Sequence, residues 1–171
     1  LAFRNDVTGN LAYIDYTGGT QTVTEIPDTM EVYHPEISPD GERVAFSTKP
    51  EGVSGKSALY VRNLDETGSG FVKLDVESAA IPRWRVLADG DTVITYVTDA
   101  GSNKTESEWM GYSTWQVPFA NGVFGTPQRI LEGSFHGGIS EDNRLAVTGA
   151  RLFRTRIADE NENITDKGMK N

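Results

Sequence analysis

The chain of 171 residues contains no cysteine, which excludes disulfide bonds and zinc sites built on thiolates. Histidine is also scarce, with two residues, so a catalytic triad that needs an imidazole base has few candidates. No apolar run approaches the roughly 18 residues that span a bilayer. No stretch has the pattern of a signal peptide, and we predict no membrane span.

Basic residues are outnumbered, with 16 lysines and arginines against 25 aspartates and glutamates and a net charge of −9. Nucleic-acid binding needs a basic surface that neutralises phosphates. The composition therefore argues against a nucleic-acid partner and favours solubility. The first residue is Leu1 rather than methionine, and we expect the chain to be part of a longer protein.

One stretch, residues 33–47, sets the pattern for the rest of the chain. Pro39-Asp40-Gly41 predicts a tight turn, because proline pre-sets φ and glycine accepts positive φ. A short apolar strand, Arg43-Val44-Ala45-Phe46, follows the turn. Similar stretches recur at residues 82–96 and 136–147. A period of roughly 50 residues predicts a repeat protein.

Each copy of this stretch is followed by a strand that carries an aromatic residue, and after the first two copies that strand opens a hairpin. These residues are Tyr60, Trp115 and Phe153, and Tyr13 occupies the same place in the opening hairpin. No apolar face with helical period occurs. We predict an all-β fold of β-propeller blades, each with four antiparallel strands, in an incomplete ring. The expected parts are a half blade at 1–32, blades at 33–78 and 79–132, and an incomplete blade at 133–171.

The segment His34-Pro35-Glu36-Ile37-Ser38-Pro39-Asp40-Gly41-Glu42-Arg43-Val44-Ala45-Phe46 resembles the repeat of the TolB-like, WD-repeat-like β-propeller family. The later copies differ from it, since Val86-Leu87-Ala88-Asp89-Gly90 keeps only the turn. Ser140-Glu141-Asp142-Asn143 lacks both the proline and the glycine. The resemblance implies a propeller over most of residues 5–157. It also implies an exported bacterial protein of the periplasm, the cell envelope or the extracellular space.

Members of that family serve as protein-interaction modules, as propellers attached to hydrolases, or as metal-dependent lyases of oligosaccharides. A fold alone does not determine function. We predict a non-catalytic binding or scaffolding module with a protein partner, the ring being completed by further residues or by a second chain. The alternatives are a propeller enzyme, or the propeller domain of one, and a carbohydrate-binding module.

His34 and His136 occupy the same place in their repeats, before the strand that lines the channel of a propeller. Two imidazoles there are possible ligands of a divalent metal, as in the lyase members of the family. The second copy has Ile81 at this place, and a metal site needs three or more ligands. We therefore predict structural histidines and no cofactor, with metal binding as the alternative.

Trp109 and Tyr112 lie beside a polar loop, residues 98–109, that we expect to be exposed. Exposed aromatic rings stack on sugars or anchor a partner protein. Both residues are therefore candidate binding residues, although core packing is the alternative. Trp115, at the aromatic place of its blade, is predicted to be buried.

Asp40, Asp89 and Asp142 recur at one place, the turn between the first two strands of each copy. Carboxylates perform acid–base chemistry when unlike groups converge. The same residue repeated on separate blades instead predicts an Asx turn, in which the side chain binds its own backbone. No nucleophile elbow, P-loop or zinc-protease motif occurs.

Overall fold

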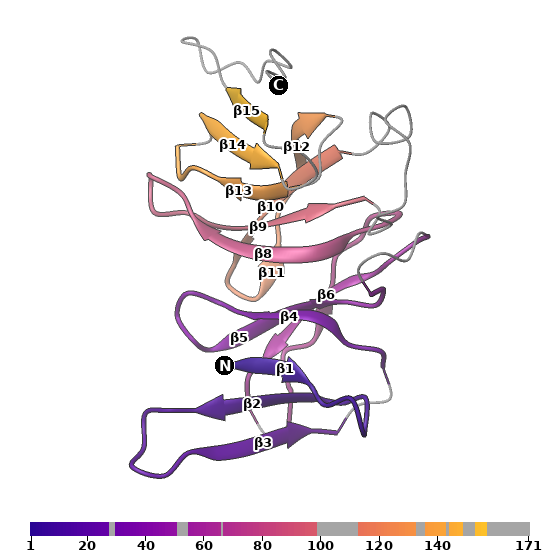
Figure 1. The fold of residues 1–171 in the computed structure, drawn as a ribbon, viewed down its shortest axis with the longest axis vertical. Coiled ribbons are helices and arrows are strands. Elements are labelled where there is room, and N and C mark those ends of the chain that lie inside the picture. Colours follow the sequence, from indigo (N-terminus) through magenta and orange to yellow (C-terminus); the bar gives the residue numbers. More distant parts are fainter. Residues whose placement is uncertain are drawn as a thin grey trace. The chain divides into compact units, whose positions relative to one another are not determined.

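A computed structural model describes the chain over residues 1–27, 30–50, 55–65, 67–98, 113–132, 136–142, 144–148 and 153–156. Within these ranges every regular element is a strand, the sheets are antiparallel, and no helix is present, as the sequence predicts (Figure 1). No helix in this part of the chain is long and apolar enough to cross a membrane. The described residues divide into two compact units, which meet in the sequence between Trp84 and Arg85.

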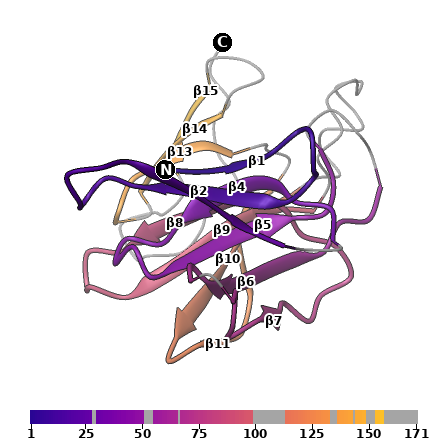
Figure 2. The same ribbon diagram turned by 90° about the horizontal axis from the view of Figure 1, so that it is seen from below.

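The first unit holds two complete sheets whose strands follow one another in chain order. One sheet has the order β1-β2-β3 and the other the order β4-β5-β6-β7, and Figure 2 shows the latter four in succession. The second sheet lies within residues 33–78, the range that the repeat predicts for one whole blade. The strands are β1 Ala2–Arg4, β2 Leu11–Asp15, β3 Thr22–Ile26, β4 Tyr33–Ile37, β5 Arg43–Ser47, β6 Leu59–Asn63 and β7 Val72–Lys73.

The two sheets of this unit share one apolar core, and β1 lies beside β4 (Figure 1). Fully buried side chains come from both sheets and from the segment between them. Their burial is the main favourable term for folding, at about 25 cal/mol per Å² of apolar surface. The buried members of this core are Leu11, Ile26, Val32, Val44 and Phe46, and Tyr13 and Tyr60 pack against them.

A third sheet crosses the boundary between the units in sequence, since its strand β8 spans Ala80–Val86. Its order is β11-β10-β9-β8, and β12 also pairs with β10. A last sheet has the order β13-β14-β15. The strands are β9 Thr92–Val97, β10 Ser113–Ala120, β11 Val123–Phe124, β12 Gln128–Glu132, β13 His136–Ile139, β14 Leu145–Thr148 and β15 Phe153–Arg156.

The turn between β10 and β11 is an Asn-Gly turn. Asn121 and Gly122 have φ values of 54° and 79°, the two positive angles of a type I′ hairpin. On either side of this turn, Phe119 and Phe124 are paired strand residues whose rings meet edge to face at 5.0 Å. Trp115 on β10 is half-buried rather than fully buried, and its indole nitrogen is enclosed without a hydrogen-bond partner among the described residues.

Candidate functional site

The start of a sheet's first strand has an unusual backbone in two of the repeats. His34 on β4 and Ile81 on β8 have φ values of 52° and 51°, in the left-handed region. A β-branched residue such as isoleucine rarely adopts this conformation, which costs of order 1–3 kcal/mol. The pairing of β4 with β5 is interrupted at the same place, between Tyr33 and Glu36. The repeat therefore builds a strained bulge where the sequence places its candidate histidine.

The hydroxyl of Ser47, on β5, ties this bulge to β8. It donates a hydrogen bond to the Tyr33 carbonyl oxygen at 3.3 Å and accepts one from the backbone N–H of Ile81 at 3.4 Å. His34 Nδ1 lies 3.3 Å from the same Ser47 hydroxyl oxygen.

This serine–histidine contact is not a catalytic dyad. Ser47 is fully buried, so no substrate reaches its hydroxyl. A nucleophile must also be free to attack, whereas the Ser47 oxygen already joins three backbone or ring partners. The contact gives His34 a structural role in the bulge. It does not assign this histidine a catalytic role.

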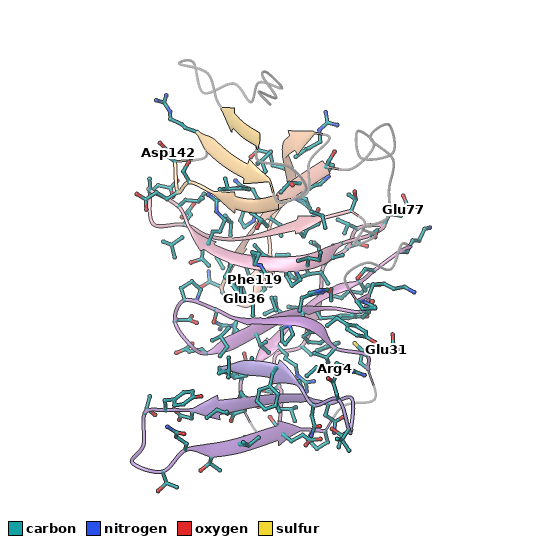
Figure 3. All side chains as sticks on the ribbon, viewed as in Figure 1. Arg4, Glu31, Glu36, Glu77, Phe119 and Asp142 are labelled. Carbon is teal, nitrogen blue, oxygen red and sulfur yellow. The ribbon has the colours of Figure 1, made fainter. Side chains whose placement is uncertain are left out.

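Glu36 lies on β4, two residues after His34 (Figure 3). It binds the first strand of the next sheet. Its Oε2 accepts a hydrogen bond from the backbone N–H of Trp84 at 2.5 Å. The Trp84 indole N–H donates to the Glu36 carbonyl oxygen at 3.0 Å. Arg83 Nη1 lies 3.9 Å from Glu36 Oε1. The first strands of two successive sheets, β4 and β8, are therefore joined through Glu36.

Burial raises the pKa of Glu36, and the hydrogen bond from Trp84 and the charge of Arg83 oppose that rise. The Glu36 and Arg83 side chains are 33% and 44% exposed. An ion pair that remains this exposed contributes little to stability, about 0–1 kcal/mol, because water screens it. The pair instead presents opposite charges to the outside beside the half-buried Trp84 indole.

We call His34, Glu36, Ser47, Arg83 and Trp84 the β4–β8 cluster. It contains one carboxylate and one imidazole, and its serine is fully buried, so the cluster offers no accessible nucleophile. No group of three or more potential metal ligands occurs among the described residues. The cluster has the composition of a recognition surface, with an indole and both signs of charge.

The four predicted site residues differ in how far the structure describes them. His34 lies in the first unit and belongs to the β4–β8 cluster. His136 begins β13, opposite Thr148, and its backbone alone is described. Trp109, Tyr112 and the polar loop 98–109, apart from Thr98, lie outside the described residues. The binding role predicted for each of the four stays a prediction.

Sequence reasoning did not single out Glu36, Ser47, Arg83 or Trp84. One signal was present: Glu36 and Arg83 stand at equivalent places of the first and second copies and have opposite charges. Opposite charges at one repeat position suggest a contact between neighbouring repeats. Ser47 had no such signal, because a serine at the end of a strand is common.

The three recurring aspartates take the role of turn residues, as predicted. Asp40 accepts the backbone N–H of Glu42 at 3.1 Å, and Asp89 accepts that of Asp91 at 3.0 Å. Asp142 accepts the backbone N–H of Arg144 at 3.0 Å. Serine hydroxyls also donate to Asp40 and to Asp142, and these bonds lower the pKa of both carboxyls. The aspartates are thus turn caps.

Neither models of protein families nor curated protein sequences yield a match to this chain.

Proposed function

We propose that the chain forms part of a TolB-like β-propeller, with its four sheets as successive blades. The second sheet supports this proposal, because β4 to β7 form one antiparallel sheet in chain order. The core shared by the first two sheets has the face-to-face packing that neighbouring blades need. The left-handed φ that His34 and Ile81 share is a backbone feature that recurs with the repeat.

The proposed function is binding of a protein partner by a non-catalytic module of an exported bacterial protein. The β4–β8 cluster is the observation that carries it. Glu36, Arg83 and Trp84 combine opposite charges with an indole at partly exposed positions. Tryptophan and arginine are the residues most enriched in the energetic centres of protein interfaces. The cysteine-free, acidic composition is compatible with a place in the periplasm or outside the cell.

Affinity capture from an envelope extract of the source organism tests this function. We expect one discrete protein to be retained by the unmodified chain and lost with Arg83→Glu, which places two acidic groups side by side. Lys56→Glu is the matched control, since it makes the same charge change at an exposed pair with Glu77. A partner retained equally by both variants would contradict a role for the cluster.

Two further measurements separate the alternative functions. Stoichiometric divalent metal in the purified protein, lost on His34→Ala, would favour a propeller lyase over a binding module. Glycan-array binding that disappears when Trp109 and Tyr112 are both replaced by alanine would favour carbohydrate as the ligand. Fractionation of the source cells tests the proposed location.

A further inference from the structure

The outer edge of the first sheet is an open strand. In the order β1-β2-β3, strand β3 pairs with β2 along its whole length, from Thr22 opposite Asp15 to Ile26 opposite Leu11. Among the described residues no strand pairs with its other side. The corresponding edge strand of the second sheet, β7, has two residues, whereas β3 has five. Very short edge strands resist unwanted pairing, and β3 lacks this protection.

The ladder determines which backbone groups of β3 face outward. Leu1 and Ile14 exchange backbone hydrogen bonds, with Ile14 N–H to the Leu1 oxygen at 2.8 Å, so the Ile14 backbone groups point toward β1. Backbone direction alternates along a strand, so the groups of Tyr13 point toward β3 and bind its partner Thr24. The N–H and C=O groups of Val23 and Glu25 therefore point away from the sheet.

The side chains of β3 do not guard this edge. Four of its five residues are threonine, valine or isoleucine, which favour strands, and it contains no lysine or proline. Its one charge, Glu25, is bound back over its own sheet. The carboxylate accepts hydrogen bonds from Thr8 Oγ1 at 2.5 Å, Asn10 Nδ2 at 2.6 Å and Asn5 Nδ2 at 3.0 Å.

We propose that two copies of this chain pair through β3 in an antiparallel, two-fold symmetric dimer centred on Thr24. Val23 of each copy then lies opposite Glu25 of the other, and each such pair exchanges both of its backbone hydrogen bonds. Thr24 faces Thr24 as a non-hydrogen-bonded pair, which agrees with the inward direction of its backbone groups. A two-fold interface of this kind is self-complementary and closed.

The charges of β3 favour this register. Glu25 faces a valine, so no like charges stand opposite each other, and cross-strand threonine pairs are favourable. The Val23 side chain, which is 60% exposed in the single chain, becomes covered by β3 of the second copy. An extended segment of another protein is the competing occupant of the edge, and the experiments below distinguish it from a second copy.

Sedimentation velocity on the unmodified chain and two variants tests the dimer. We expect the unmodified chain to shift from monomer to dimer as its concentration rises. Val23→Pro removes an outward N–H and leaves the bonds to β2 intact, so it should be monomeric with unchanged circular dichroism. Val23→Thr keeps the N–H and should still dimerise. A monomer at every concentration, or a dimer that survives Val23→Pro, would overturn the proposal.

Cysteine cross-linking tests the register, and the absence of native cysteine makes it unambiguous. Thr24→Cys places two thiols in a facing pair, within the Cβ separation of about 4 Å that a disulfide needs. Mild oxidation should convert this variant to a covalent dimer. Lys73→Cys, on the outer edge of the second sheet, should remain monomeric under the same conditions. Equal cross-linking of the two variants would contradict pairing through β3.

Discussion

At the scale of single residues, Arg62 and Gly68 share one enclosed space. Arg62 is 7% exposed, and its Nε donates a hydrogen bond to the Gly68 carbonyl oxygen at 3.2 Å. Its guanidinium carbon also lies 5.7 Å from the centre of the Phe71 ring, a cation–π contact. Gly68 has a φ of 57°, and a Cβ built on it would lie 1.8 Å from the Arg62 guanidinium. Glycine is favoured there by its conformation, and a Cβ would in addition displace the Arg62 guanidinium.

Gly68→Ala should therefore lower the free energy of unfolding by about 2–4 kcal/mol, through backbone strain and displacement of a buried guanidinium. The matched control is Gly41→Ala, where φ is 79° and no atom lies within 4 Å of the new Cβ. This control should lose only the strain, about 1–2 kcal/mol. Urea denaturation of the two variants measures the difference. Equal losses would show that Arg62 moves aside without cost.

Glu36 makes stability depend on pH with a definite sign. Burial raises its pKa in the folded state above the ordinary glutamate value of 4.5. The folded form is then favoured by protonation, so this contribution is complete below pH 4.5 and is lost as the pH rises through the folded pKa. Glu36→Gln keeps an oxygen to accept the Trp84 N–H but does not ionise.

We expect Glu36→Gln to gain stability relative to the unmodified chain as the pH rises from about 4 to 7, with the difference reaching a plateau at neutral pH. Thermal unfolding in a series of buffers measures the effect. Glu42→Gln is a suitable control, because Glu42 is exposed on the following turn. A difference that shrinks with rising pH would mean that the Arg83 charge outweighs burial.

At the scale of the strand, β5 differs from a half-exposed strand because both of its faces are covered. Four consecutive residues, from Val44 to Ser47, are fully buried. Val44 and Phe46 point into the core shared with the first sheet. Ser47, with the opposite side-chain direction, binds the β8 backbone at Ile81. A single strand thus connects to elements on both sides of its sheet.

Phe46→Ala should destabilise the fold by about 3–5 kcal/mol, because it leaves a cavity in the shared core. The Phe46 ring is fully buried and stacks on Tyr60 at 5.7 Å. Phe71→Ala removes an identical ring from the edge of the same aromatic group. Because Phe71 is already 42% exposed, its loss should cost about 1 kcal/mol. Chemical denaturation compares the two, and similar losses would argue against a core centred on Phe46.

Ser47→Ala should cost about 1–3 kcal/mol, since it leaves buried backbone groups of Tyr33 and Ile81 without this partner. Hydrogen exchange of the Ile81 amide should also accelerate. Ser57→Ala is the control, because Ser57 is similarly buried and its hydroxyl accepts a bond from Thr48 instead. If Ile81 exchanges at an unchanged rate in Ser47→Ala, the serine is not what connects the two strands.

At the scale of the whole chain, the net charge of −9 opposes the dimer that the β3 edge favours. Repulsion between two acidic copies acts at a distance and is screened by salt, whereas backbone hydrogen bonds are not. Raising sodium chloride from about 0.02 M to about 0.5 M should therefore tighten the dimer. Sedimentation equilibrium at the two salt concentrations measures this. Dissociation by salt would instead indicate an interface held by ion pairs.

The all-β class and most strand positions could be predicted from the sequence, because both depend on neighbours in the chain. Val44-Ala45-Phe46 is apolar and follows a proline–aspartate–glycine turn, so strand and turn are determined by local propensity. The turn role of Asp40 follows from the same local chemistry, a side chain bonding to a backbone two residues away. Strand β1 was not predicted, since three residues are too few for a pattern.

The β4–β8 cluster depended on contacts between residues far apart in the chain. Trp84 meets Glu36 across 48 positions, and Ile81 meets Ser47 across 34. No local preference encodes these pairs. Indeed, local preference opposes the left-handed isoleucine at 81, which persists because packing and the Ser47 hydrogen bond outweigh its strain. Repeating strands and turns therefore followed from local chemistry, whereas which charged and aromatic groups lie together emerged only when distant strands packed.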